Sequence, residues 1–148
     1  MKPHGEAHDR DKKGYRWSIP SSLTRIEPLC QDTRAILTRH SLSRYSYRTE
    51  VLLREFMNNA IVHGNQSDVN KAVTVSMRIN QESVELEITD EGPGFDWKAV
   101  PLEPPDESAT SGRGLAIGAI YADGMFFNER GNQVTLRLNT GETKENSR

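Results

Sequence analysis

The sequence contains a single cysteine, Cys30, among its 148 residues. One cysteine excludes an internal disulfide and any metal site built from several thiolates, so we interpret Cys30 as a small, partly buried residue. Long apolar runs are also missing, and none approaches the roughly 18 residues that a membrane-spanning helix needs. The opening stretch, MKPHGEAHDRDKKGYRW, is polar and lacks the apolar core of a signal peptide. We therefore expect a cytoplasmic protein with no membrane partner.

An excess of charge of one sign is missing as well. The chain has 19 basic and 21 acidic residues, a formal net charge of −2, and both signs are interspersed. This pattern is unlike the basic patch of a nucleic-acid-binding protein, so we expect proteins or small molecules as partners and no nucleic acid. The length suits one domain with a hydrophobic core. We predict a tail over residues 1–13, one domain over residues 14–140 and a second tail over residues 141–148.

The first half of the domain contains two predicted helices. YRWSIP alternates and stops at Pro20, which is typical of a short strand at the edge of a sheet. Helical spacing then predicts one helix from Ser22 to about His40 and a second from about Tyr47 to Val62, ending near Gly64. The second helix carries one apolar stripe, formed by Leu52, Leu53, Phe56 and Ala60.

The second half of the domain is predicted to consist mainly of strands. Residues 72–79 and 83–90 alternate between apolar and polar, and the NQE between them is a turn typical of a hairpin. A proline-rich and acidic loop follows over residues 97–111, and loops of this length are usually lids, binding loops or disordered segments. A short helix then begins at Gly114, and a closing hairpin has Gly131 in its turn. This order predicts an α+β fold, a two-layer sandwich with helices covering one face of a mixed, mostly antiparallel sheet.

Three polar residues of the second helix do not suit a helix that only packs. Glu55, Asn59 and His63 are spaced by four and line up along one edge, which overlaps the apolar stripe. Asn59 falls next to Leu52 on a helical wheel, and a buried carboxamide without a partner costs about 1–3 kcal/mol. Asn59 therefore either caps a neighbouring loop, with Glu55 simply solvated, or binds a ligand.

Asp90 presents the same conflict at the end of a strand. It continues the parity of Ile88 and should point towards the core, where an ionised carboxylate needs strong donors. Either the backbone N–H groups of the following turn, DEGPGF, or the amine of a ligand can supply them. By itself, a DxGxG stretch at a strand end is more typical of a turn than of a binding site.

The stretch SGRGLAIG, residues 111–118, joins the long loop to the short helix. Glycines let the backbone approach a ligand, and the free N–H groups at a helix start bind anions, so this stretch is typical of a phosphate cradle. It is not a P-loop, because GxxxxGK[ST] is absent. Nor is it a dinucleotide fingerprint, because Ile117 stands where GxGxxG needs glycine.

In this order, the three stretches resemble the motifs of the GHKL ATPase superfamily, which has the Bergerat ATP-binding fold. EFMNNAIVHG is similar to its N box, DEGPGF to its first glycine box and SGRGLAI to its second. The variant ExxxNAxxHG, the small chain and the N-terminal strand and helix most resemble the anti-sigma factor serine/threonine-protein kinases. The resemblance covers about Tyr15 to Asn139.

The resemblance implies ATP and Mg²⁺ as cofactors and gives single residues a role. Asp90 would accept a hydrogen bond from the adenine amine, and Gly92 and Gly94 would let the chain pass beneath the base. Asn59 would hold the Mg²⁺, and Glu55 would be the general base. The residues implied around the phosphates are His63, Thr110, Ser111, Gly112, Arg113, Gly114 and Leu115. For His63, simple packing at the helix end is the alternative.

Asn132 departs from the family pattern, which usually has threonine after the glycine of the closing hairpin. It lies on the parity of Val134 and Leu136. Because an asparagine can still donate and accept hydrogen bonds near the adenine, we expect Asn132 to contact the nucleotide.

The resemblance implies a serine kinase that phosphorylates a small anti-anti-sigma (STAS-type) partner and sequesters a sigma factor. It also implies a homodimer that forms through exposed sheet or N-terminal elements. The alternative is a nucleotide-controlled protein-binding module without kinase activity. The catalytic half of a histidine kinase fits less well, because no segment suits a phosphoacceptor dimerisation helix and His40 is not in an acceptor motif.

Overall fold

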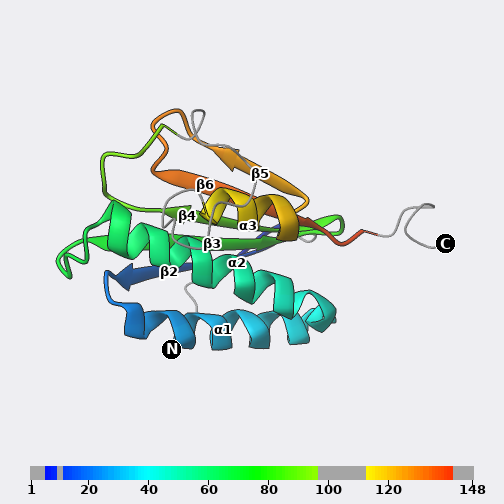
Figure 1. Cartoon of the computed structure of the whole chain (residues 1–148). Coiled ribbons are helices and arrows are strands. Elements are labelled where there is room, and N and C mark those ends of the chain that lie inside the picture. The colour runs from blue at the N-terminus through cyan, green and yellow to red at the C-terminus, as the bar shows by residue number, and fades with distance from the viewer. Residues whose placement is uncertain (1–5, 10–11, 97–112, 142–148) are drawn as a thin grey trace.

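The computed structural model describes residues 6–9, 12–96 and 113–141, which form a two-layer α+β sandwich. The elements in chain order are β1 (Glu6–Asp9), β2 (Lys12–Pro20), α1 (Ile26–Arg39), α2 (Ser46–Asn58), β3 (Ala72–Ile79), β4 (Ser83–Thr89), α3 (Arg113–Tyr121), β5 (Gly124–Phe127) and β6 (Gln133–Asn139). Figure 1 shows α1, α2 and α3 on the same face of the sheet, so the expected fold class is confirmed. No helix within these ranges has the length and apolar character to cross a membrane.

The sheet has the strand order β1-β2-β3-β4-β6-β5. Every pairing among the described strands is antiparallel, which corrects the expected mixed sheet. The reason is that β5 and β6 form a hairpin whose second strand returns beside β4 in the opposite direction. In this register Val75 of β3 lies opposite Trp17 on one side and Ile88 on the other, so the apolar side chains form one surface under the helices.

The alternation predicted for β3 and β4 is confirmed. The buried parity comprises Val73, Val75, Met77, Ile79, Val84, Leu86 and Ile88. The other parity faces away from the helices and carries charged side chains. Arg78 Nη2 lies 3.8 Å from Glu85 Oε1 and 3.9 Å from Glu87 Oε2. Exposed ion pairs of this kind add little stability. The helix-covered face of the sheet therefore supplies the core.

Trp17 joins β2 to α1. Its ring is fully buried, and its indole N–H donates to Asp32 Oδ2 over 3.0 Å. Pro28 is tolerated in α1 because the N–H groups of the first helical turn have no intrahelical acceptor. The bond from Trp17 to Asp32 thus connects α1 to β2, and Figure 1 shows α1 beside that strand.

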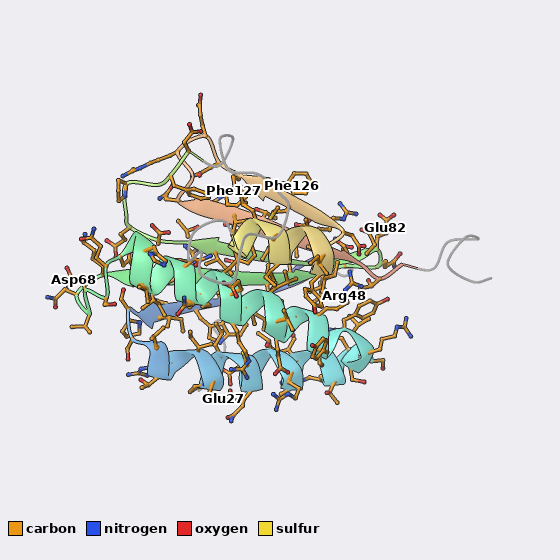
Figure 2. The ribbon with its side chains drawn as sticks, in the orientation of Figure 1. Glu27, Arg48, Asp68, Glu82, Phe126 and Phe127 are labelled. Carbon is orange, nitrogen blue, oxygen red and sulfur yellow. The ribbon has the colours of Figure 1, made fainter. Side chains whose placement is uncertain are left out.

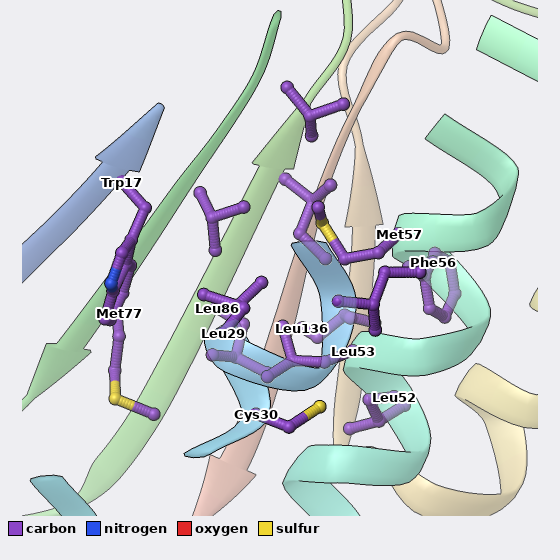
Figure 3. Packing of buried hydrophobic residues seen from close by; sticks show 14 of the residues in the cluster. Trp17, Leu29, Cys30, Leu52, Leu53, Phe56, Met57, Met77, Leu86 and Leu136 are labelled. Carbon is purple, nitrogen blue, oxygen red and sulfur yellow. The ribbon is translucent and has the colours of Figure 1, made fainter. Parts of the chain in front are cut away.

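α2 supplies the predicted apolar stripe and then changes its hydrogen bonding. Its stripe residues Leu52, Leu53 and Phe56 are buried, and Figure 3 shows them on the side of the core opposite Trp17. Residues Asn59–Gly64, which we predicted as further α-helix, form a π-helical segment instead. The Asn65 N–H donates to the Ala60 carbonyl at 2.8 Å, the wider i to i+5 pattern of such segments. Segments of this kind are frequent at functional sites.

The N-terminal boundary differs from the prediction. Residues 6–9 and 12–13, which we assigned to a tail, belong to β1 and β2. A strand at a sheet edge is held by backbone hydrogen bonds, so it forms without the apolar alternation that marks a core strand. β1 covers only the beginning of β2, with Glu6 opposite Gly14, so the rest of β2 is the expected edge.

The C-terminal half follows the prediction closely. α3 begins at Arg113, one residue before the predicted start. The closing hairpin is confirmed, and Gly131 in its turn has φ +84°, a conformation that favours glycine. The Arg48 guanidinium ties α2 to the end of α3, because Nε donates to the Tyr121 carbonyl at 2.9 Å (Figure 2). The predicted loop over residues 97–111 and the last residues of the second tail, 142–148, lie outside the described residues.

Cys30 offers a test of this core. Its side chain is fully buried, and burial raises the pKa of its thiol to about 11. Because the thiolate is the reactive form, folded protein at about pH 8 should react with a thiol-specific reagent at least about 100-fold more slowly than urea-unfolded protein. The reaction is followed spectroscopically. A similar rate in both states would contradict the buried position of Cys30.

Candidate functional site

A pocket of about 270 Å³ opens where the ends of several elements meet. It lies between α2 with its π segment, the end of β4, the start of α3 and the β5–β6 turn. The predicted site residues that line it are Asn59, His63, Asp90, Gly94, Leu115 and Asn132. Much of the remaining wall is apolar and includes Phe56, Ala60, Ile88, Phe127 and Val134.

The other predicted site residues lie elsewhere. Glu55 is half-buried on α2, four residues before Asn59, and is not among the lining residues. Gly92 lies directly behind the lining, bonded to the Asp90 side chain. Thr110, Ser111 and Gly112 lie outside the described residues, and Arg113 and Gly114 are described only as the first residues of α3.

Asp90 follows the last residue of β4, with its half-buried carboxylate in the pocket wall. Oδ1 accepts the backbone N–H of Gly92 at 2.7 Å. Oδ2 has no hydrogen-bond partner in the described part of the chain and can accept a bond from a ligand. Burial raises the pKa of this carboxyl, while the Gly92 N–H and the charge of Arg130 act in the opposite direction. Oδ1 therefore accepts a hydrogen bond from the following turn, which is one of the two alternatives that we considered, and Oδ2 can accept one from a ligand.

Gly64 and Gly92 let the π segment pack directly against Asp90. A Cβ atom on Gly64 would collide with the Asp90 carboxylate, and one on Gly92 would collide with the Gly64 carbonyl. The helix end and the turn after β4 can approach this closely only because both residues lack a side chain. The two glycines thus bring the N-box residues and the carboxylate to one wall of the pocket.

Asn65, which the sequence pattern did not reveal, connects these segments. Its side chain is fully buried. Oδ1 accepts the Glu91 backbone N–H at 2.7 Å, and Nδ2 donates to Ser21 Oγ at 3.0 Å and to the Ala72 carbonyl at 3.1 Å. A polar residue directly after a helix-ending glycine is usually an exposed turn residue. Only its contacts with segments distant in the sequence explain why Asn65 is buried.

The β5–β6 turn holds Asp90 from the other side. The Asp90 N–H donates to the Asn132 carbonyl, and Asn132 Nδ2 donates to the Asp90 carbonyl, both at 2.9 Å. Asn128, also missed, donates from Nδ2 to Asn132 Oδ1 at 2.8 Å and accepts the Gly131 N–H at 2.8 Å. Asn132 lines the pocket, but both the oxygen and the nitrogen of its carboxamide are hydrogen-bonded within the protein. Its main part in the structure is to position Asp90.

Two further glycines join the loop after Asp90 to the hairpin turn. Gly94 and Gly131 both have φ +84°, and a Cβ on either would collide with the carbonyl of Arg130 or Phe95 respectively. Phe95 packs edge-on against Phe127, with ring centroids 5.5 Å apart. Both rings line the pocket, so this contact forms an aromatic wall beside Asp90.

Asn59 and His63 line the pocket from the π segment. No hydrogen bond joins the Asn59 carboxamide to another described residue, so the loop cap that we considered is not found in this part of the chain. His63 is exposed rather than packed. Glu55 precedes Asn59 by four residues, and its carbonyl accepts the Asn59 N–H. The side chains of Asn59 and His63 are thus the two polar groups that the π segment contributes to the pocket lining.

The chemistry of the pocket suits a ligand with two different ends. The apolar and aromatic residues that share the lining with Asp90 suit a flat ring that carries an amine, while Asn59 offers an amide oxygen in the same lining. No group of three or more His, Cys, Asp or Glu within the described ranges could hold a metal ion alone. A cation at Asn59 would therefore take further oxygen ligands from the bound molecule and from water.

Residues 19–138 match the family model of the histidine kinase-like ATPase domain. The match covers most of the 148 residues and every candidate site residue, so the chain belongs to this family and to the GHKL superfamily. The resemblance found in the motifs is confirmed at this level, and membership supports ATP binding. A search of curated proteins found no match.

Asp90→Asn should separate ligand binding from folding. The Asn Oδ1 can still accept the Gly92 N–H, but its amide would present a donor to the ligand amine, so we expect ATP binding to weaken at least about 100-fold in calorimetry. Because the folded state raises the pKa of Asp90, the ionised carboxylate destabilises the fold above that pKa. The melting temperature of the variant at pH 7 should therefore equal or exceed that of the wild type, and this advantage should shrink as the pH is lowered. Unchanged ATP affinity would contradict the assignment.

Proposed function

We propose that this histidine kinase-like ATPase domain is a serine kinase and an anti-sigma factor. It binds ATP with Mg²⁺, phosphorylates a seryl hydroxyl of a small anti-anti-sigma (STAS-type) partner and sequesters a sigma factor, acting as a homodimer. The observation that carries the proposal is the free Oδ2 of Asp90 among apolar lining residues, with Asn59 in the lining of the same pocket. The ExxxNAxxHG form of the N box supports the choice of partners.

The adenine end of ATP is assigned to Asp90. Oδ2 would accept a hydrogen bond from the base amine, and Ile88 and Val134 would supply apolar surface for the ring. Gly94 lies in the lining at this end and keeps the wall free of a side chain. Asn132 holds Asp90 in place and has one Nδ2 proton left for the nucleotide.

The phosphate end is assigned to Asn59 and to the start of α3, where Leu115 lines the pocket. The Asn59 oxygen would hold the Mg²⁺, whose charge would neutralise the phosphate oxygens during transfer. His63 and the residues from Thr110 to Arg113 would complete this end, as the family resemblance implies.

Glu55 is assigned the role of general base. Its carboxylate would take the proton of the seryl hydroxyl as the hydroxyl oxygen forms a bond to the γ-phosphorus. The bond from that phosphorus to the bridging oxygen breaks, and ADP leaves. In the described residues Glu55 has no ion-pair partner, so the carboxylate is not committed to a structural salt bridge.

The kinase proposal is tested with labelled ATP and the cognate anti-anti-sigma protein. Wild type should place phosphoserine on the partner, and Glu55→Ala should slow this step by about 100-fold or more while ADP affinity changes little. Glu50→Ala is the matched control, because Glu50 lies on the same helix but pairs with Arg34 away from the pocket. Absence of phosphoserine with intact ATP binding would reject the kinase assignment.

A nucleotide-controlled protein-binding module is the second candidate, because Glu55 lies outside the pocket lining. A pull-down from the native cell with and without ATP separates the two. A kinase and anti-sigma factor should exchange a sigma factor for a small single-domain partner, and Glu55→Ala should block the exchange. If Glu55→Ala behaves as wild type while Asp90→Asn abolishes the exchange, the bound nucleotide only controls shape.

A further inference from the structure

The buried Asn65 side chain extends the site beyond the pocket. Its Oδ1 holds the Glu91 N–H, next to the base-binding Asp90, while its Nδ2 reaches Ser21 Oγ and the Ala72 carbonyl. Ser21 follows the last residue of β2 and is 2% exposed. Asn65 and Ser21 are both absent from the pocket lining. A continuous chain of hydrogen bonds therefore runs from the turn after β4 to the corner between β2 and α1.

Ser21 is fixed in this corner by hydrogen bonds to Lys71 on one side and to Asn65 on the other. Its hydroxyl donates to the Lys71 carbonyl at 2.6 Å and accepts from Asn65 Nδ2 at 3.0 Å. The Ser21 N–H donates to the same Lys71 carbonyl at 3.2 Å. Without the hydroxyl, the Lys71 carbonyl still accepts the Ser21 N–H and Asn65 Nδ2 still donates to the Ala72 carbonyl. The Asn65 carboxamide, however, loses one of the three hydrogen bonds that hold it.

Glu91 forms a second, independent link to the same place. Its Oε2 accepts the Ala72 N–H at 2.6 Å, so both the backbone and the side chain of Glu91 are bonded to the Asn65 corner. Glu91 is exposed, and its side chain is not part of the pocket lining. The turn that carries Asp90 is thus held at its outer side by two bonds whose partners lie outside the pocket.

We propose that Asn65, Ser21 and Glu91 are positioning residues for the nucleotide site. They hold the turn of Asp90 so that Oδ2 faces the pocket before the ligand arrives, and they make nucleotide affinity depend on the corner between β2 and α1. This inference rests on the proposed nucleotide binding at Asp90. Preorganisation of this kind acts on affinity, because the bound arrangement no longer has to be selected from several orientations of the carboxylate.

Ser21→Ala tests the link from outside the pocket. Calorimetry with ADP and Mg²⁺ should show a Kd about 3- to 10-fold higher than wild type, within the range of remote coupling energies. With ATP as substrate, KM should rise by a similar factor and kcat should change little. Ser22→Ala is the matched control, because among the described residues the Ser22 hydroxyl bonds only to the exposed Thr24 hydroxyl; its Kd should equal that of wild type.

Glu91 provides a second pair of variants that do not alter a buried residue. Glu91→Ala removes the acceptor of the Ala72 N–H and should raise the Kd for ADP, whereas Glu91→Gln keeps an acceptor oxygen and should restore most of the affinity. Thermal unfolding is measured for each variant. A lower melting temperature with an unchanged Kd in both Ser21→Ala and Glu91→Ala would show a purely structural network and overturn the inference.

The two proposals fail in different ways. If wild type binds no ADP, nucleotide binding is wrong and the positioning role is rejected with it. If wild type binds ADP, Asp90→Asn abolishes binding and both network variants bind as wild type does, the proposed function stands and only the positioning role is rejected.

Discussion

The hydrogen bond from the Glu91 backbone N–H to the buried Oδ1 of Asn65 joins the helix layer to the sheet layer at the pocket. On the helix side, the π segment ends at Gly64, so close to Asp90 that no Cβ fits between them. Without the Glu91 N–H, the Asn65 carboxamide would be buried with an unpaired oxygen, at a cost of about 1–3 kcal/mol. The position of the Asp90 carboxylate therefore depends on a bond that lies outside the pocket.

Around this bond, some polar side chains are hydrogen-bonded within the protein, and others are free to bind a ligand. Asn65, Asn128 and Asn132 direct their carboxamides at backbone groups, as buried polar groups usually do. Among the described residues, Asp90 uses one carboxylate oxygen to accept the Gly92 N–H and keeps the other free, and the Asn59 side chain has no hydrogen-bond partner. These two exceptions both line the pocket and agree with membership of the histidine kinase-like ATPase family.

Much of the fold could be predicted because local periodicity reports which face of an element is buried. The alternation of β3 and β4 and the stripe of α2 are confirmed, and the conflicts at Asn59 and Asp90 pointed to two residues of the pocket. β1 was missed because backbone pairing at an edge leaves no apolar pattern. The π segment was missed because one widened turn hardly changes the spacing of apolar residues along the helix.

By itself, the sequence determined the order of the elements from β2 onwards apart from the π segment, their buried faces and two side chains that packing could not explain. These properties depend on neighbours within a few residues, which a linear pattern records. Only the tertiary structure decided that Asn65 meets Ser21 and Glu91, and that Asn132 binds Asp90 rather than facing only the pocket. Such contacts depend on strand register and on the close approach of glycine backbones, and both arise when segments far apart in the chain pack together.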